Sequence, residues 1–158
     1  MNRNRYLGLG TKLRLLLALL DGELGALYKQ QGHEFRPRFF PVFQLLLDQD
    51  KASVSEISVA LQTSQPAATQ TLAEMKRLDL VAYQSGNDRR ERLAHLTPKA
   101  LELARELQPT WEAVQSAAQQ LDRELPHPLS DVLDEALAAL NRKSFTDRIR
   151  ENNPSPGD

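Results

Sequence analysis

The chain has 158 residues, about the length of one domain, and it contains no cysteine. Disulfide scaffolds, thiolate zinc sites and thiol nucleophiles are therefore excluded. Its 20 Lys and Arg residues against 21 Asp and Glu residues give a net charge of −1, which excludes a polycation that coats nucleic acid but permits a local basic surface. The longest apolar run, residues 15–20, is far shorter than the roughly 20 residues that cross a bilayer. We expect a cytoplasmic protein with no membrane partner.

Two helices are predicted before residue 50. Leucines spaced three and four positions apart form an apolar stripe that predicts a helix over residues 11–31, and Gly32 is suited to end it. Pro37 is favoured in a first helical turn and predicts the start of a second helix over residues 37–48. The many large apolar side chains of this second helix indicate burial on most of its sides.

A pair of short helices is predicted after a polar break at residues 48–52. Ser53 and Glu56 have the spacing of a capping box, which predicts a helix over residues 54–61. The turn at residues 62–64 ends in Ser64, an N-cap residue for a helix over residues 65–78 with Pro66 in its first turn. Two helices joined by such a turn are typical of a helix-turn-helix.

Short β-like runs follow at residues 80–84 and 92–96, and the turn residues between them predict a hairpin. Thr97 and Pro98 then predict the start of a long helix that runs to about residue 125, with a kink at Pro109. A last helix is predicted over residues 129–143, and the polar tail over 152–158 is expected to be disordered. The expected fold is mainly α with a small β-hairpin, a winged helix-turn-helix.

The predicted helix over residues 65–78 has two different faces. Ala68, Leu72 and Met75 share the inner face at about 100° per residue. The opposite face contains no acid and consists of Pro66, Gln70, Ala73 and Arg77, with Thr69 and Lys76 on one flank and Glu74 to the side. Glutamine can pair with adenine, and threonine offers a hydroxyl and a methyl group to thymine, so this face suits a DNA major groove. An ordinary amphipathic helix with a solvated polar face is the alternative.

The predicted hairpin carries three arginines. Arg89 and Arg90 follow the turn, and Arg92 lies on the returning strand. Arginines at the tip of a two-stranded ribbon can enter a minor groove, and Asp88 is placed to brace Arg90 by an ion pair. A charged hairpin whose arginines only keep the protein soluble is the alternative for this segment.

Residues 88–97, DRRERLAHLT, resemble the wing motif of the MarR family of bacterial transcription regulators, Asp-x-Arg followed after five residues by Leu-Thr. The helix-turn-helix of that family is resembled by Ile57, Leu61, Ser64, Thr69, Leu72, Met75, Leu80 and Val81. Gln62 and Asp79 depart from it, because they stand where glycine is common and are expected to need a positive φ. Gln70 stands where many members have arginine, so a different operator is expected. The DNA-binding residues expected from the helix face and this resemblance are Ser64, Gln65, Thr69, Gln70, Lys76, Arg77, Arg89 and Arg90.

The resemblance also implies a homodimer that binds a pseudo-palindromic operator. Residues 1–34 and 109–151 would form the dimerisation helices and residues 35–108 the winged head. The apolar stripes of the first and last helices support this, since symmetric dimers commonly bury such faces. Packing of the two stripes on each other within one chain is the alternative. Family members often bind small aromatic acids, which implies an effector site near Tyr28, Arg36 and Phe39; core aromatics beside a surface arginine are the alternative for these residues.

These observations favour a homodimeric DNA-binding repressor, which a small aromatic or acidic ligand would release. A winged-helix adaptor that binds other proteins and not DNA is the rival hypothesis. The three histidines have no metal-ligand spacing, and the sequence contains neither a phosphate-binding glycine loop nor a catalytic serine motif. No metal, cofactor or enzymatic activity is expected.

Overall fold

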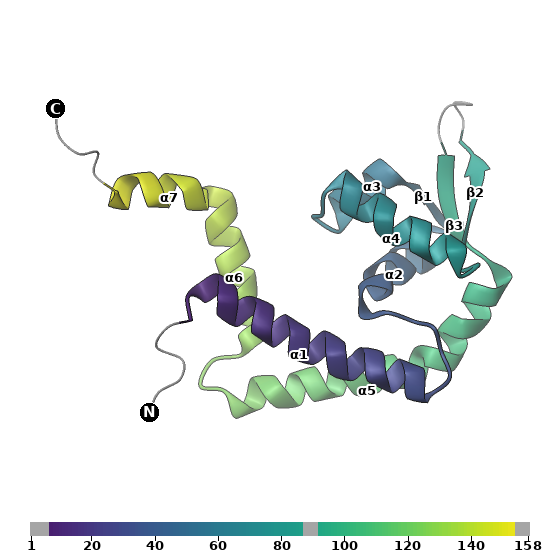
Figure 1. Ribbon diagram of the computed structural model, residues 1–158, viewed down its shortest axis with the longest axis horizontal. Helices are drawn as coiled ribbons and strands as arrows, with labels where there is room; N and C mark the ends of the chain where they lie inside the picture. Colours follow the sequence, from purple (N-terminus) through teal and green to yellow (C-terminus); the bar gives the residue numbers. More distant parts are fainter. Residues whose placement is uncertain (1–6, 87–91, 154–158) are drawn as a thin grey trace. The chain divides into compact units, whose positions relative to one another are not determined.

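The computed structural model describes residues 7–86 and 92–153, and these divide into two compact units, Met1–Glu106 and Leu107–Asp158. The elements of the first unit are α1 (Leu9–Gln30), the 3₁₀ helix η2 (Pro37–Phe39), α2 (Phe40–Gln49), β1 (Lys51–Ser53), α3 (Val54–Ala60), α4 (Gln65–Arg77), β2 (Val81–Ser85) and β3 (Arg92–Leu96). Helix α5 (Pro98–Glu124) begins in the first unit and ends in the second, where α6 (Leu129–Arg142) and α7 (Phe145–Asn152) follow. Figure 1 shows the β2–β3 hairpin beside α4. This arrangement is the predicted winged helix-turn-helix.

The caps of α3 and α4 confirm the predicted helix starts. The Ser53 hydroxyl accepts a hydrogen bond from the backbone N–H of Glu56 (3.2 Å), and the Ser53 N–H donates to the Glu56 carboxylate (2.7 Å). The Ser64 hydroxyl accepts from the N–H of Ala67 (3.3 Å) at the start of α4. Each cap satisfies N–H groups that the first helical turn leaves without a partner.

The turns on both sides of α4 contain non-glycine residues with positive φ. Gln62 has φ 50° and Asp79 has φ 58°, as the family resemblance implied, and Asp50 at the end of α2 has φ 67°. Asparagine and aspartate tolerate this left-handed conformation better than glutamine does. The Asp79 turn is held further by the hydroxyl of Thr97, which donates to the Asp79 carbonyl (2.7 Å).

The sheet contains a strand that the sequence did not predict. Its order is β1-β3-β2, with both pairs antiparallel, and β1 pairs Lys51 with His95 and Ser53 with Leu93. Residues 48–52 were expected to be only a polar break, and this expectation is wrong for the part that forms β1. A strand of this length is too short to show the alternation that predicts strands, and its stability comes from β3.

The core of the first unit includes an aromatic cluster formed by Tyr28, Phe35, Phe39 and Phe43. The ring of Phe35 contacts the other three edge-on, with centroid distances of 4.9 Å to Tyr28, 5.7 Å to Phe39 and 5.0 Å to Phe43. The expectation that α2 is buried on most sides is wrong, because Phe40 and Leu47 are 36% and 42% exposed. Helix α2 buries one face only, through Val42, Phe43 and Leu46.

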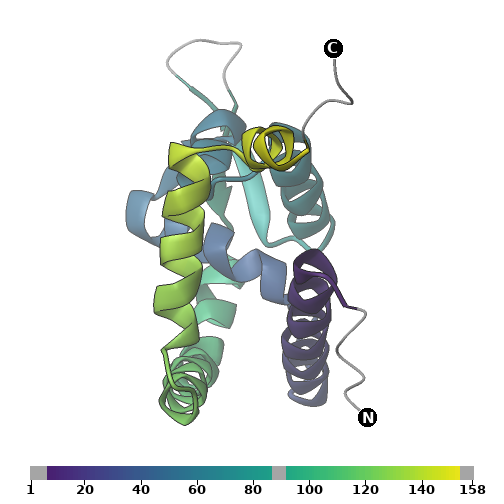
Figure 2. The ribbon, with the colours of Figure 1, turned by 90° about the vertical axis from the view of Figure 1, so that its left-hand side faces the viewer.

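The second unit contains the predicted long and last helices and one more. Helix α5 continues through Pro109, and α6 begins at Leu129 as expected. Helix α7 was not predicted, although Ser144 caps it by accepting from the N–H of Asp147 (3.1 Å). Figure 2 shows α7 turned away from the axis of α6.

The start of α6 is held by a carboxylate of α5. Asp122 accepts hydrogen bonds from the Ser130 hydroxyl (2.7 Å) and from the N–H groups of Leu129 (2.8 Å) and Ser130 (3.3 Å). The hydrogen bond from the Ser130 hydroxyl, more than the two backbone ones, lowers the pKa of Asp122 below its ordinary value of 3.8. Asp122 therefore stabilises the fold above its ordinary pKa, and this contribution disappears as the pH falls through the lowered value.

Replacing Asp122→Asn is expected to lower the thermal unfolding temperature at neutral pH, because the neutral amide is a weaker acceptor for the N–H and hydroxyl donors at the start of α6. The difference from the unchanged chain should shrink as the pH falls below 3.8, where the carboxyl gains its proton. Unfolding followed by circular dichroism across this pH range checks the prediction. Asp134→Asn, an exposed aspartate on α6, is the control, and a difference that does not change with pH would contradict the cap.

Candidate nucleic-acid interface

Helix α4 presents one face to solvent and the other to the core. Ala68, Leu72 and Met75 are buried, as the spacing predicted. The residues of the opposite face are all exposed, and they are Pro66, Gln70, Ala73 and Arg77. The solvent-facing surface of α4 therefore offers an amide and a guanidinium among small side chains, with no carboxylate at its centre.

Ser64, Gln65, Thr69, Gln70, Lys76 and Arg77, the six described residues expected to bind DNA, are all exposed. Two of them also have structural contacts. Ser64 caps α4, and the Gln65 side chain donates to the hydroxyl of Ser55 in α3 (3.3 Å). The other four lie within the body of α4 and leave its exposed face available to a duplex.

The flank of α4 that carries Lys76 is joined to the hairpin through an aromatic ring. The Lys76 Nζ lies 5.6 Å from the ring centroid of Tyr83 on β2, and the Arg92 Cζ of β3 lies 4.9 Å from the same centroid. Cations over a tyrosine face are attracted by its π electrons. Tyr83 thus gathers two cations at the junction of α4 and the hairpin. The sequence analysis missed this residue, whose partners come from two other elements.

The expected tip residues Asp88, Arg89 and Arg90 lie outside the described residues. They belong to the connection between Ser85 and Arg92, which are paired across β2 and β3. The role expected for them stays a prediction from the sequence.

The opposite flank of α4 carries an ion-pair cluster. The Arg36 Nη2 lies 2.8 Å from Oε1 of Glu74, and Arg38 pairs with the other carboxylate oxygen. The Glu74 side chain is 12% exposed, whereas those of Arg36 and Arg38 are 55% and 44% exposed. Glu74, the acid beside the predicted DNA-facing surface, is therefore covered and neutralised by two cations.

The structure does not bring Tyr28, Arg36 and Phe39 together as a ligand site. Tyr28 is 1% exposed and Phe39 is 0% exposed, because both belong to the aromatic cluster. Arg36 is paired with Glu74. Two of the three residues thus have no surface to offer a ligand, which corrects the expectation for this position.

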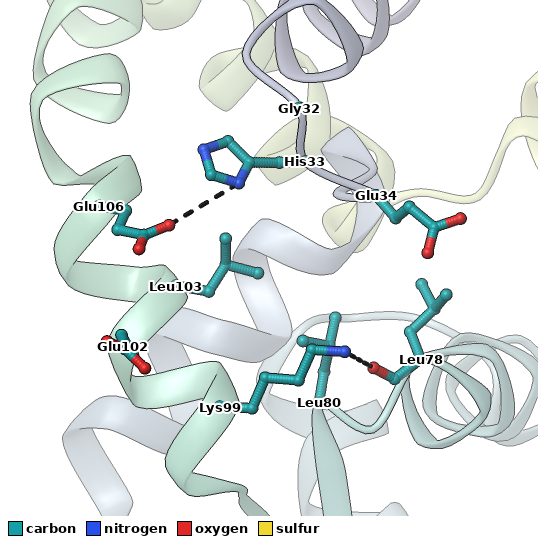
Figure 3. Close-up of a pocket in the computed structure, with 9 residues that line it drawn as sticks. All are labelled: Gly32, His33, Glu34, Leu78, Leu80, Lys99, Glu102, Leu103 and Glu106. Carbon is teal, nitrogen blue, oxygen red and sulfur yellow. Dashed lines mark hydrogen bonds and ion pairs between the residues drawn. The ribbon is translucent and has the colours of Figure 1, made fainter.

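A cavity of about 290 Å³ lies elsewhere in the first unit, between the α1–η2 connection, the end of α4 and the start of α5 (Figure 3). Its lining residues are Gly32, His33, Glu34, Leu78, Leu80, Lys99, Glu102, Leu103 and Glu106. The Lys99 ammonium donates to the carbonyl of Leu78 at the end of α4 (2.8 Å), and the His33 Nδ1 lies 3.8 Å from the Glu106 carboxylate. Among the residues that the structure describes, no three His, Asp or Glu side chains are grouped to hold a metal ion.

The Leu-Thr end of the wing motif has a structural function. Leu96 is buried, and the Thr97 hydroxyl accepts from the N–H of Ala100 (3.1 Å) while it donates to the Asp79 carbonyl. Thr97 therefore caps α5 and holds the turn after α4 with the same oxygen.

Most of the large apolar side chains that remain exposed in the described residues lie on three helices. On α1 they are Leu9, Leu13, Leu15, Leu17, Leu19, Leu20 and Leu27, and on α6 and α7 they are Val132, Leu133, Leu137, Leu140, Phe145 and Ile149. Neither α6 nor α7 contains a buried residue. None of the helices in residues 7–86 and 92–153 combines the length and the apolar composition that a bilayer crossing requires. Exposed apolar surface of this extent marks an interaction site.

Comparisons with known proteins agree with this geometry. Residues 40–91 match a sequence model of the MarR family, and no similar sequence is found among curated proteins. The M. tuberculosis transcriptional regulator MosR in complex with DNA is 18% identical, with 87% of this chain and 99% of that chain covered and a TM-score of 0.69. A mutant of E. coli MarR complexed with operator DNA is also 18% identical, with 89% and 98% covered and a TM-score of 0.66.

A third similar structure is that of Bordetella bronchiseptica BpsR, from work on the regulation of its DNA binding by 6-hydroxynicotinic acid. It is 21% identical, with 91% of this chain and 98% of that chain covered and a TM-score of 0.65. At these identities the structures establish a common fold. The sequence match covers α2, β1, α3, α4 and β2, and over these residues the chain is similar to the MarR family, whose fold it shares.

Proposed function

We propose that the chain is a DNA-binding transcription regulator in which α4 enters a major groove. The exposed acid-free face of α4 carries this proposal, since Gln70 and Thr69 can contact base edges while Lys76 and Arg77 contact phosphates. The helix is anchored in the core through Leu72 and Met75, so the opposite face is held outward. The DNA-bound states of the M. tuberculosis and E. coli relatives support the same use of this fold.

The working form in this proposal is a homodimer. The exposed leucines of α1 and α6 support it, because a symmetric partner would cover the same stripes on both copies. Two heads related by a twofold axis would bind half-sites roughly 34–36 Å apart in a pseudo-palindromic operator. We propose repression as the mode of action, in which a bound dimer would compete with other proteins for the same DNA. No catalytic activity is proposed.

Release by a small-molecule effector is part of the same proposal, with its position corrected. We place the effector in the cavity beside the end of α4. Leu78 and Lys99 both line this cavity, and the Lys99 ammonium donates to the Leu78 carbonyl at the end of α4. Its lining includes three carboxylates, those of Glu34, Glu102 and Glu106 (Figure 3). This favours a neutral or cationic small molecule over the aromatic acid expected from the family.

Selection of bound sequences from random DNA by the purified protein tests the proposal. A recovered inverted repeat, bound with an affinity that falls steeply as salt rises, is the expected result. If the protein binds neither selected nor bulk DNA, the regulator hypothesis is overturned and the protein–protein adaptor is favoured.

Replacing Gln70→Ala is expected to change the preferred base at one position of each half-site. A bidentate contact between glutamine and adenine contributes about 1–3 kcal/mol of discrimination, which the alanine loses. Repeating the selection with the variant measures this change. Gln44→Ala, an exposed glutamine on α2, is the matched control, and uniform weakening without a changed preference would show that Gln70 does not recognise a base.

A further inference from the structure

The α1–η2 connection and η2 contain two arginines whose positions are fixed by their neighbours. Phe35 and Phe39 are buried in the aromatic cluster, and Pro37 begins η2. Arg36 and Arg38 alternate with these residues, and both reach the Glu74 carboxylate of α4. We call Arg36 and Arg38 the arginine pair.

The arginine pair lies on the flank of α4 opposite the hairpin. Glu74 follows Gln70 by four positions, so the two side chains are neighbours on the helix surface. Lys76, which contacts Tyr83 of the hairpin, is about 200° around the helix from Glu74. Cations therefore border the exposed face of α4 on both sides, with Lys76 and Arg92 on one flank and the arginine pair on the other.

The charges of this cluster favour a phosphate. A single carboxylate beside Gln70 would repel a DNA backbone, but two guanidiniums and one carboxylate leave a net charge of +1. Each guanidinium has five N–H donors in a fixed fork, and about half of each arginine side chain remains exposed, so donors stay available to a second anion. Glu74 is itself nearly covered and cannot accept from a base.

A helix of about 10–12 Å diameter fills a major groove about 12 Å wide, so a phosphate backbone passes along each of its flanks. We propose that the arginine pair binds the DNA backbone on the flank of α4 opposite the hairpin, and that Glu74 is the positioning residue that holds both guanidiniums there. This inference rests on the proposed function, since it assigns residues to the same DNA complex.

The test uses the full chain, the selected operator and a scrambled duplex of equal length, with dissociation constants measured over a range of salt concentrations. The double variant Arg36→Gln/Arg38→Gln is expected to bind both duplexes more weakly, by about tenfold for each lost contact at roughly 0.1 M salt. The slope of log K against log salt should fall by about two units for each bound head. Arg105→Gln, an exposed arginine of α5, is the matched control and should change neither quantity.

The Glu74→Gln variant distinguishes a role of Glu74 in positioning the two arginines from an effect of its negative charge alone. It removes one negative charge and keeps both arginines, so the scrambled duplex should bind more tightly while the ratio of operator to scrambled affinity falls. A Glu74→Gln chain with an unchanged ratio would overturn the positioning role.

Weaker DNA binding by the double glutamine variant would also result from a less stable fold. Thermal unfolding of each variant, and a second variant that keeps both charges, distinguish this explanation from a lost phosphate contact. Arg36→Lys/Arg38→Lys keeps both positive charges and should retain the salt slope even if the fold is less stable. A double glutamine variant with the slope of the unchanged chain would overturn the inference while the proposed function stands. Absence of DNA binding by the unchanged chain would instead remove the proposed function.

Discussion

A chain carrying Leu137→Glu is expected to be monomeric and to bind an operator with two half-sites about 10²–10⁴-fold more weakly than the unchanged chain, which we propose to be a dimer. Leu137 is 54% exposed on α6, a helix with no buried residue, so its apolar surface is available to a second copy. A carboxylate there would have to lose its hydration when two chains associate, and burial of an unpaired charge is strongly unfavourable. The two heads would then bind their half-sites independently.

Light scattering measures the mass of this variant, and gel shifts on one and two half-sites measure the loss of joint binding. Ala138→Glu is the matched control, because Ala138 is also exposed and lies outside the apolar stripe formed by Val132, Leu133, Leu137 and Leu140. It introduces the same charge without touching the stripe and should leave the dimer intact. A Leu137→Glu chain that stays dimeric would show that α6 does not form the interface.

Replacing Phe35→Ala should lower the free energy of unfolding by about 3–5 kcal/mol, the cost of removing a buried phenylalanine. Its ring is the one that contacts Tyr28, Phe39 and Phe43 edge-on, so its loss leaves a cavity between α1, η2 and α2. Such edge-on contacts add to the free energy gained from burial itself.

Chemical denaturation at a fixed protein concentration checks this value, since the proposed dimerisation would make the apparent stability depend on concentration. Phe40→Ala is the matched control, because Phe40 lies five residues after Phe35 and is 36% exposed, whereas Phe35 is buried. It should cost clearly less. Equal losses for Phe35 and Phe40 would contradict the aromatic cluster as the centre of the core.

The features that the sequence predicted correctly depend on neighbouring residues in the chain. The caps at Ser53 and Ser64 and the buried face of α4 follow from spacings within one helix or turn, whereas the positive φ of Gln62 and Asp79 was implied by the resemblance to the MarR family. These local preferences agree with the final fold, so they could be recognised without it.

The features that were missed depend on contacts between elements. Strand β1 is stabilised by β3, and Tyr83 obtains its two cations from α4 and β3. The apolar residues of α2 indicated burial but not which of its sides the neighbours would cover. Tyr28 and Phe39 were assigned to a ligand because an aromatic residue near an arginine has the same sequence pattern in a pocket and in a core.

The hydroxyl of Thr97 has a consequence for how operator release could begin. One oxygen atom holds both the turn that follows α4 and the first turn of α5, so neither can be loosened without affecting the other. Fraying of α5 at its beginning would free the Asp79 carbonyl and let the end of α4 shift out of register with a groove. In the proposed complex, dissociation from DNA would therefore start at the end of α4, beside the base of the hairpin.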